Sequence, residues 1–339
     1  MEAFLIDAWL RGTTESMPMR DEASVSVARE AVRREGARLG LPVPVVASLA
    51  TAASELGHNQ LRHGHAGLIV LRAIERDGVP GLELLAADQG GGITNPTEAL
   101  RGAGSASGGL GVGLSGVRNL VDEVDFDVRL GEGTCIWARK FATRVRRRRE
   151  IGVLGRPHKA ERVSGDAAGF VRLDDSVMLA VADGLGHGPA AREASMLAIR
   201  HVMESPEQPL DDLHAGCHAA LGHTRGAVMA LARIADGADE ASIASVGNVA
   251  AYVCGPASSH RVPGAPFALG VPGPARTVRV HRTPLGARDA LVLYTDGLVG
   301  RATLDGELDL LREHPIVVAH AMLERFGRDD DDVLVLVAR

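Results

Sequence analysis

A run of arginines divides this sequence into two halves with different hydrophobic patterns. The run reads RVRRRRE and occupies residues 144–150. Helical repeats and a glycine-rich passage come before it, whereas short apolar strands dominate after it. A chain of 339 residues is also long for one hydrophobic core, since domains hold about 150 residues. We therefore expect two domains, at residues 1–141 and 155–339, joined by a basic linker at 142–154.

Composition narrows the classes of protein that this chain can belong to. Hydrophobic residues make up 45% and charged residues 24%, as in ordinary globular proteins. The 37 basic and 43 acidic residues give a net charge of −6, so we expect no nucleic-acid partner. No apolar run is long enough to cross a membrane, and the first residues lack a cleavage pattern, which predicts a cytoplasmic location. The scattered Cys135, Cys217 and Cys254 predict buried fillers rather than a thiolate metal site.

The first half is predicted to begin with two helices and a hairpin. Apolar residues recur at helical spacing from Asp21 to Leu39, and a second helix follows Pro42. The segments 68–74 and 81–88 are rich in branched apolar residues and predict the two strands of a hairpin. A glycine-rich passage then leads into a helical pattern at Val117–Val124.

Polar residues in this half suggest a nucleotide site. Glu55 and Asn59 stand four residues apart in the second helix, so both side chains project from one face. An Asn oxygen can hold Mg²⁺, and a nearby Glu can accept a proton. Asp88 ends a predicted strand and offers an acceptor for an exocyclic amine. The glycine-rich loop after it supplies amide donors for phosphate.

Four separated boxes, SELGHN, ADQGGGI, SGGLGVGLSGVRNLVDE and GEGT, closely resemble the GHKL (Bergerat-fold) ATPase and kinase family. Within that family the likeness is to the small serine kinases of the RsbT and RsbW type. The resemblance implies an α/β sandwich with helices on one face of a mixed sheet, and ATP with Mg²⁺ as cofactor. It also implies that Asn59 binds the Mg²⁺, Glu55 is the catalytic base and Asp88 contacts adenine. The pocket would be shaped by Gly90, Gly92, Gly109, Gly111 and Gly113.

Three functions of this domain remain open at this point. The kinases that it resembles phosphorylate STAS-domain proteins, so unphosphorylated STAS-domain proteins are the expected partners. The domain could instead bind ATP only to regulate the second half. It could also be an anti-sigma module that sequesters a sigma factor or binds a sigma-factor regulator. A homodimer is compatible with the kinase relatives, and His58 beside the asparagine is given no role.

The second half places acidic residues at the ends of apolar strands. Asp166, Asp183, Asp296 and Asp331 each abut a hydrophobic segment. One such residue before a glycine predicts only a turn. Four that converge in one domain would repel one another and require cations, and hard oxygen ligands suit Mg²⁺ or Mn²⁺. Asp332 adjoins Asp331, so the ligand in that run is open by one position.

The order SGD, ADGLGHG, GN, TDG and DDVLVLV resembles the SpoIIE-type and RsbX-type serine phosphatases of the protein phosphatase 2C (PPM) superfamily. The resemblance implies a β-sandwich flanked by helices, which together with the first domain gives an α+β chain. It implies a metal-dependent serine/threonine phosphatase in which Asp183 is catalytic and bridges two Mn²⁺ or Mg²⁺ ions. The carbonyl of Gly184, with Asp166, Asp296 and Asp331, would complete the metal site. Phosphorylated STAS-domain proteins would be the substrates.

The two resemblances together predict a bifunctional partner-switching regulator, with a kinase and a phosphatase acting on STAS-domain proteins of a stressosome pathway. Two features stay open. His187 could be a general acid or a group outside the metal shell, and the arginine-rich linker could be a flexible tether or a continuous helix. His214 and His218 stand four residues apart, and without a third ligand nearby they predict a surface helix rather than a zinc site.

Overall fold

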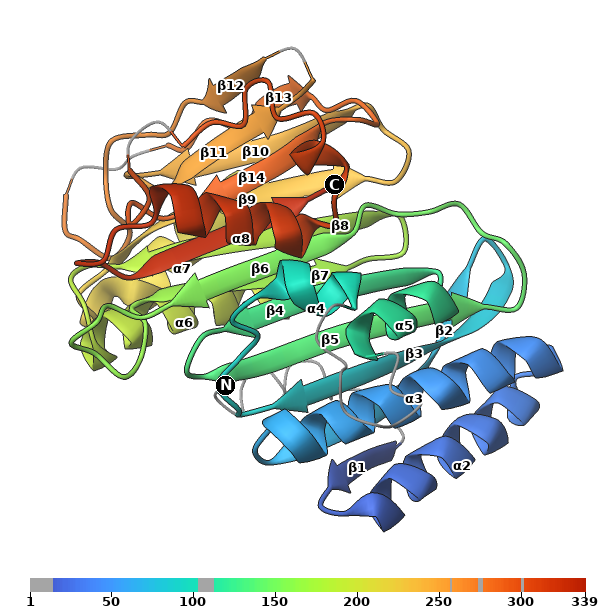
Figure 1. Cartoon of the computed structure of the whole chain (residues 1–339). Helices are drawn as coiled ribbons and strands as arrows, with labels where there is room; N and C mark the ends of the chain where they lie inside the picture. Colours follow the sequence, from blue (N-terminus) through green and yellow to red (C-terminus); the bar gives the residue numbers. More distant parts are fainter. Residues whose placement is uncertain (1–14, 103–112, 257, 274–276, 300–301) are drawn as a thin grey trace. The chain divides into compact units, whose positions relative to one another are not determined.

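The computed structural model describes residues 15–102, 113–256, 258–273, 277–299 and 302–339. The chain forms two compact units, unit 1 at Met1–Glu150 and unit 2 at Ile151–Arg339 (Figure 1). Both combine helices with β-sheets, as expected for an α+β chain. Within the described residues, no helix combines the length and the apolar character needed to span a membrane.

The helices of unit 1 begin and end where the sequence signals predict. Asp21 caps the first of them, because its carboxylate accepts a hydrogen bond from Ser24 N at 2.8 Å and its own amide donates to Ser24 Oγ. Gly40, with φ of 67°, follows its end. The helices are α2 (Glu22–Arg38), α3 (Val43–His63), α4 (Pro96–Arg101) and α5 (Gly113–Leu120). The helical pattern expected at Val117–Val124 is wrong at its end, since Val124 lies in a strand.

The sheet of unit 1 contains β1 (Glu15–Met19), β2 (Gly67–Arg76), β3 (Val79–Asp88), β4 (Glu123–Arg129) and β5 (Gly133–Phe141). Within this unit the strands lie in the order β1-β2-β3-β5-β4, and each neighbouring pair is antiparallel. The expected mixed sheet is therefore wrong in this detail. The pairs β2–β3 and β4–β5 are hairpins with short turns, which can join only antiparallel strands. Figure 1 shows α2, α3 and α5 along one face of this sheet.

Unit 2 is built from two antiparallel sheets. One has the order β6-β15-β14-β11-β12 and the other β13-β10-β9-β8-β7. The strands are β6 (Ile151–Arg156), β7 (Asp166–Arg172), β8 (Ser176–Gly184), β9 (Ala227–Ala235), β10 (Glu240–Val246), β11 (Ala250–Cys254), β12 (Ser259–Val262), β13 (His281–Pro284), β14 (Ala290–Tyr294) and β15 (Val333–Ala338).

Helices flank both sheets of unit 2, as the sandwich architecture requires. α6 packs on β7 and β8, α7 packs beside α6, and α8 packs on β6 and β15. Their bounds are α6 (Pro189–Glu204), α7 (Leu210–Ala220) and α8 (Pro315–Phe326), with short 3₁₀ turns η1 (Leu221–His223) and η2 (Leu310–Arg312).

Two expectations about single residues have different outcomes. The three cysteines are buried and free, which confirms their role as core fillers. The surface position expected for His214 is wrong, because this side chain is buried on α7 and its Nδ1 lies 2.8 Å from the carbonyl oxygen of Leu210. An i, i+4 spacing alone does not say which face of a helix the two residues occupy.

Candidate functional sites

A cavity of about 510 Å³ opens in unit 1 beside α3 and the end of β3. Asn59 lines it from α3, Asp88 from β3, Gly92 from the following loop and Gly113 from the start of α5. Its volume lies within the range of small-molecule sites, roughly 300–1,000 Å³. The structure thus brings together four of the residues predicted for a nucleotide site.

Asp88 is held at the mouth of the glycine-rich loop. Its Oδ1 accepts a hydrogen bond from Gly90 N at 2.7 Å, and burial raises the pKa of its carboxyl. A side chain at Gly90 would stand 2.5 Å from the carbonyl oxygen of His63, so the close approach of loop and helix requires glycine. Gly92 has φ of 79°, a conformation that also favours glycine. An acceptor on a half-buried strand end is suited to an amine donor of a flat ring.

Glu55 stands apart from this lining. Its Oε2 accepts a hydrogen bond from Gly113 N at 3.1 Å, so the carboxylate holds the first residue of α5. Among the described residues that line the cavity, Asn59 is present and Glu55 is not. Gly109 and Gly111 lie outside the described residues.

Thr134 also lines the cavity, although it was not among the predicted site residues. It pairs with Asp88 across strands β3 and β5 and lines the same cavity. Its hydroxyl can donate or accept, which complements a carboxylate that only accepts. The signal was present in the sequence, because Thr134 ends the GEGT box.

In unit 2 the strand register places two of the predicted acids side by side. Asp166 begins β7 and pairs directly with Asp183 near the end of β8. Asp296 follows β14, and Asp331 precedes β15. The carboxylate of Asp166 also accepts a hydrogen bond at 2.7 Å from Thr295 Oγ1, which connects it to the turn that carries Asp296. The ends of β7 and β8 and the turn after β14, which are distant in sequence, therefore lie next to one another.

The charges of these acids oppose one another. Burial, and then the charge of Asp183, raise the pKa of Asp166 well above its usual value. Burial, then the charges of Asp296 and Asp331, raise the pKa of Asp183 to about 8. The pKa of Asp296 is raised by its burial and by Asp331. Carboxyls held in this state resist ionisation unless a cation is supplied.

The structure separates Asp331 from Asp332. Asp332 is only 4% exposed, and its two oxygens accept hydrogen bonds from the backbone amides of His158 and Gly165 at 2.7 and 2.8 Å. Asp331 is half-buried, and its charge acts on both Asp183 and Asp296. Asp332 thus holds the loop before β7, and its charge also acts on Asp166 and Asp183, so both acids lie near the other carboxyls.

Gly184 needs to be a glycine for a packing reason. A Cβ at this position would overlap the backbone of Ala191 in the first turn of α6. Its amide donates to the carbonyl oxygen of Gly165 at 3.2 Å, which ties β8 to the loop before β7. The helix therefore packs directly against the segment whose carbonyl is predicted to be a ligand.

Asn248 is a further residue at the site. Its Nδ2 donates a hydrogen bond of 2.6 Å to Oδ2 of Asp296 and so orients that carboxylate. The residue belongs to the GN box of the sequence, but no spacing in the chain links it to Asp296. On the neighbouring loop, His187 Nδ1 lies 2.8 Å from Glu161 Oε1, and the His187 ring stacks on His158 with centroids 5.9 Å apart.

The donor set of unit 2 suits hard divalent cations. Among the described residues, no three His, Cys, Asp or Glu side chains converge on a single point. Such a cage is not required, because Mg²⁺ keeps several waters and takes only one or two carboxylates from the protein. Buried carboxyls whose ionisation is resisted are the observation that fits bound cations, since a cation relieves both their burial and their mutual repulsion.

Comparison with known proteins divides the chain in the same way. Residues 18–140 match the family of the histidine kinase-like ATPase domain. Residues 173–339 match the family of the stage II sporulation protein E, SpoIIE.

Similar proteins were found for both units. The serine/threonine-protein kinase RsbT of Bacillus subtilis (strain 168) is 37% identical over 120 residues, which cover 35% of this chain and 90% of RsbT. The phosphoserine phosphatase RsbX of the same organism is 28% identical over 138 residues, or 40% of this chain and 68% of RsbX. A crystal structure of RsbX in complex with magnesium, at 20% identity and a TM-score of 0.50, covers 57% of this chain and 96% of its own and shares the fold.

A solved chain from a study of the bacterial stressosome is also similar. It is 31% identical, has a TM-score of 0.53, and the match covers 57% of this chain and all of that chain.

Proposed function

Since this chain belongs to the RsbT family through its histidine kinase-like ATPase domain and carries a SpoIIE phosphatase domain after it, we propose that it is a bifunctional partner-switching regulator. Unit 2 removes phosphate from phosphoserine or phosphothreonine of STAS-domain proteins of a stressosome pathway. Unit 1 binds ATP with Mg²⁺ and phosphorylates STAS-domain proteins. Both activities on one chain would set the level of phosphorylation of a shared partner.

The phosphatase proposal rests above all on the four carboxyls of unit 2. Burial and mutual repulsion raise the pKa of Asp166, Asp183 and Asp296, and the charge of Asp331 adds to that repulsion. Such a cluster destabilises the fold, and this indicates a functional site at which a bound ligand offsets the destabilisation. Two Mn²⁺ or Mg²⁺ ions, when bound, would lower the pKa of the attacking water and neutralise the phosphoryl oxygens.

The residues of unit 2 would divide this work. Asp183 pairs with Asp166 across β7 and β8, and the charges of Asp296 and Asp331 act on it, so it would hold the ions together with these acids. Asp166, the carbonyl of Gly184, Asp296 and Asp331 would supply the remaining protein oxygens. Thr295 and Asn248 orient two of these carboxylates by hydrogen bonds. Asp332 fixes the backbone of the loop before β7.

In unit 1 the cavity would bind ATP. Asn59 would hold the Mg²⁺, Asp88 would accept from the exocyclic amine of adenine, and Gly90, Gly92 and Gly113 would allow close approach of the backbone. The N-terminal end of α5 at Gly113 would attract phosphate through the positive end of its helix dipole.

A second candidate function is favoured by the position of Glu55. Its carboxylate already accepts a hydrogen bond from Gly113 N, so it couples α3 to the start of α5. In this contact Glu55 could couple nucleotide binding in the cavity to the position of α5, instead of abstracting a proton. On this reading the ATP domain regulates the phosphatase without being a kinase.

The phosphatase is tested with a phosphorylated STAS-domain protein and Mn²⁺. We expect phosphate release by the wild type and a loss of at least about a hundredfold for Asp183→Ala, because the bridging ligand is removed. The matched control is Asp309→Ala, an exposed acid whose partner Arg312 is three residues away. Equal release by wild type and Asp183→Ala would refute the phosphatase proposal.

The role of ATP is tested with Asn59→Ala. Loss of phosphotransfer from ATP to an unphosphorylated STAS-domain protein, with dephosphorylation unchanged, supports a kinase. A changed rate of dephosphorylation without any phosphotransfer by the wild type supports a regulator. If nucleotide binds equally to wild type and Asn59→Ala, the magnesium role of Asn59 is wrong.

A further inference from the structure

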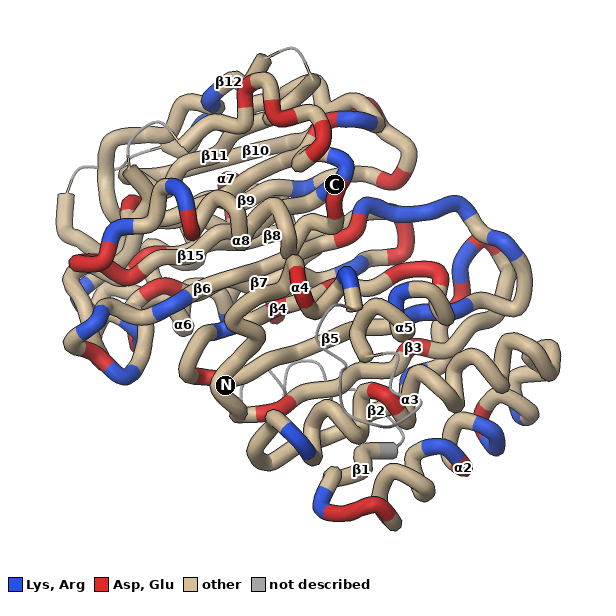
Figure 2. The backbone as a smooth tube through the Cα atoms, in the orientation of Figure 1, with Lys and Arg blue, Asp and Glu red and all other residues tan. Residues whose placement is uncertain are grey.

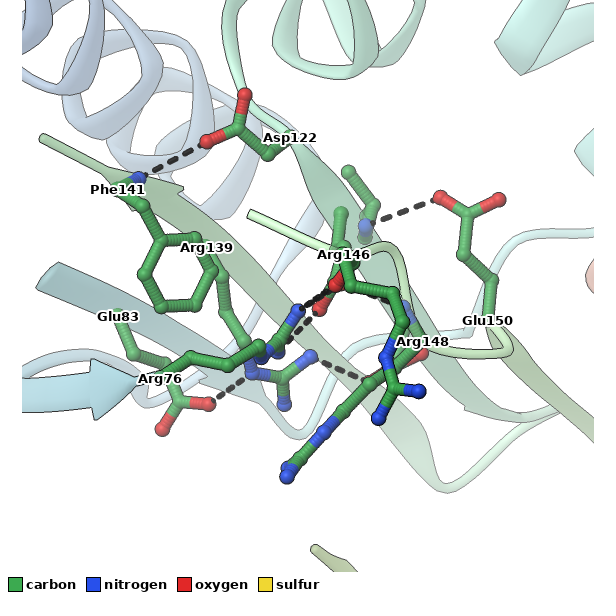
Figure 3. A network of polar contacts seen from close by, with 11 residues as sticks. Arg76, Glu83, Asp122, Arg139, Phe141, Arg146, Arg148 and Glu150 are labelled. Atoms are coloured by element: carbon green, nitrogen blue, oxygen red, sulfur yellow. Dashed lines mark hydrogen bonds and ion pairs between the residues drawn. The ribbon is translucent and has the colours of Figure 1, made fainter. Parts of the chain in front are cut away.

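The basic segment that ends unit 1 is neither a helix nor a loose tether. Residues 142–150, here called the strap, contain no helix or strand. Ala142 N donates to the carbonyl oxygen of Pro80 at 2.8 Å, and Arg76 Nη1 donates to the carbonyl oxygen of Arg146 at 3.1 Å. Arg148 N donates to Glu123 Oε1 at 3.0 Å, and Val124 N donates to Glu150 Oε1 at 3.2 Å (Figure 3). The strap is thus fixed along its length.

The anchor of the strap is a buried ion pair. Arg76 and Glu123 are 8% and 1% exposed, and Nη1 and Nη2 of Arg76 both donate to the Glu123 carboxylate. The guanidinium also lies 4.5 Å from the centroid of the Phe141 ring. A buried pair is stable only when further hydrogen bonds satisfy it. The strap backbone supplies these bonds, so the anchor and the strap stabilise each other.

The anchoring uses the backbone of the strap and leaves its charges unused. Arg144, Arg146 and Arg147 have exposed side chains, and within the described residues none of the three guanidiniums has an acidic partner. Other exposed arginines behave differently. Arg33, Arg38 and Arg312 each pair with an acid three residues away.

The strap therefore concentrates positive charge in a chain whose net charge is −6. Figure 2 shows a stretch of basic residues, in blue, along the strap. Arg144, Arg146 and Arg147 lie within four consecutive residues, and all three are exposed. Three exposed cations so close in sequence suit the carboxylates of an acidic segment, because arginine binds a carboxylate through two parallel hydrogen bonds.

We propose that Arg144, Arg146 and Arg147, which belong neither to the cavity lining nor to the carboxyl cluster, form a docking site for an acidic segment of the protein partner. That this partner is also the phosphoprotein substrate rests on the proposed function. Because the strap backbone is already ordered, a partner does not bear the entropic cost of ordering it. A run of arginines that served only as a solvated tether would need no buried anchor.

Direct binding tests the site without reference to catalysis. The probe is a fluorescein-labelled oligoglutamate peptide, followed by anisotropy with the full chain. We expect binding by the wild type, about tenfold weaker binding by the triple variant R144Q/R146Q/R147Q, and steep weakening with salt for the wild type only. The control R261Q/R282Q/R288Q removes three exposed arginines of unit 2 and should bind as the wild type does.

Catalysis supplies the second arm of the test. The triple variant should raise the KM for a phosphorylated STAS-domain protein about tenfold at unchanged kcat, while hydrolysis of p-nitrophenyl phosphate stays as in the wild type. If the wild type releases no phosphate but binds the peptide through the strap, the proposed function fails and the docking site stands.

Two results would overturn the proposal. One is equal binding of the peptide by the wild type and the triple variant. The other is tighter strap-dependent binding of a duplex DNA oligonucleotide than of the peptide, which would make the partner a nucleic acid.

Discussion

The two units neutralise their buried acids in opposite ways. In unit 1, Arg139 donates to Glu83 and to Asp125, both at 2.5 Å, and Arg76 and Arg129 pair with Glu123 and Asp127. In unit 2, the contacts described for Asp166 and Asp296 come from the neutral side chains of Thr295 and Asn248. Charges balanced within the fold serve its structure, whereas acids left unbalanced mark a place where the protein needs a ligand.

The same difference appears in the pKa values. The acids beside Arg139 raise the pKa of this guanidinium, so the charged state is favoured despite burial. The acids of unit 2 instead raise one another's pKa, and the charged state is disfavoured. Substitutions that remove charge should therefore change stability with opposite signs in the two units.

The largest effect is expected for Arg139→Met. This change leaves Glu83 and Asp125 buried without their shared cation, which should lower the free energy of unfolding of unit 1 by about 3–5 kcal/mol. Urea denaturation followed by tryptophan fluorescence reports this unit, because Trp9 and Trp137 are the only tryptophans of the chain.

The control for this prediction is Arg72→Met. Arg72 also contacts Glu83, but its side chain is 35% exposed, so the loss should be about 1 kcal/mol or less. Equal losses for Arg72 and Arg139 would contradict the view that burial decides the size of the effect.

Taken per pH unit, the pH dependence of unit 2 is the next effect in size. The pKa of Asp183 is raised from 3.8 to about 8, so between these values the folded state holds a proton that the unfolded state has released. The contribution of this proton to the free energy of unfolding of unit 2 is fully present below pH 4. It decreases as the pH rises toward 8, by at most about 1.4 kcal/mol per pH unit for each retained proton. Asp166 and Asp296 act in the same direction.

Denaturation in EDTA at several pH values measures this slope, and near-ultraviolet signals of Tyr252 and Tyr294 report unit 2, since the chain has no other tyrosines. Added Mn²⁺ should flatten the slope, because a bound cation favours the ionised carboxylates. If unit 2 of the metal-free protein became more stable as the pH rises, the view that its acids are unbalanced within the fold would be wrong.

A smaller effect of opposite sign to that of Arg139→Met is expected for Asp183→Asn. In EDTA near pH 8 the amide removes a buried charge that faces Asp296 and Asp331, so unit 2 should gain about 1–3 kcal/mol. The same variant should lose the stabilisation by Mn²⁺ that the wild type shows. A variant less stable than the wild type in EDTA would mean that the acids of unit 2 are balanced within the fold.

The sequence was sufficient to predict the parts of the molecule that depend on local pattern. Helical periodicity predicted α2 and α3, and the pattern of acids beside apolar segments predicted that Asp166 and Asp183 lie at strand ends, where they pair. Each of these signals lies within a few residues of chain. The full register of strand pairs, by contrast, is set by tertiary packing.

Other parts depended on contacts between distant residues and were not predicted. Asn248 reaches Asp296 only after two strands pair, and Thr295 reaches Asp166 across 129 positions of the sequence. The composition of the strap could not show that a buried glutamate, Glu123, holds its backbone. The strand order of unit 1 likewise depends on β5 of the second hairpin pairing with β3 of the first, which local propensity does not encode.

The smallest expected effects separate two adjacent acids. Asp332→Asn replaces one of two oxygens that accept backbone hydrogen bonds from His158 and Gly165, and should destabilise unit 2 by about 1–2 kcal/mol with Mn²⁺ affinity little changed. Asp331→Asn should leave stability in EDTA unchanged or slightly higher and weaken Mn²⁺ binding, measured by calorimetry. If instead Asp332→Asn abolished Mn²⁺ binding and Asp331→Asn did not, the ligand would be the buried acid. The loop before β7 would then be ordered by the metal rather than by the carboxylate alone.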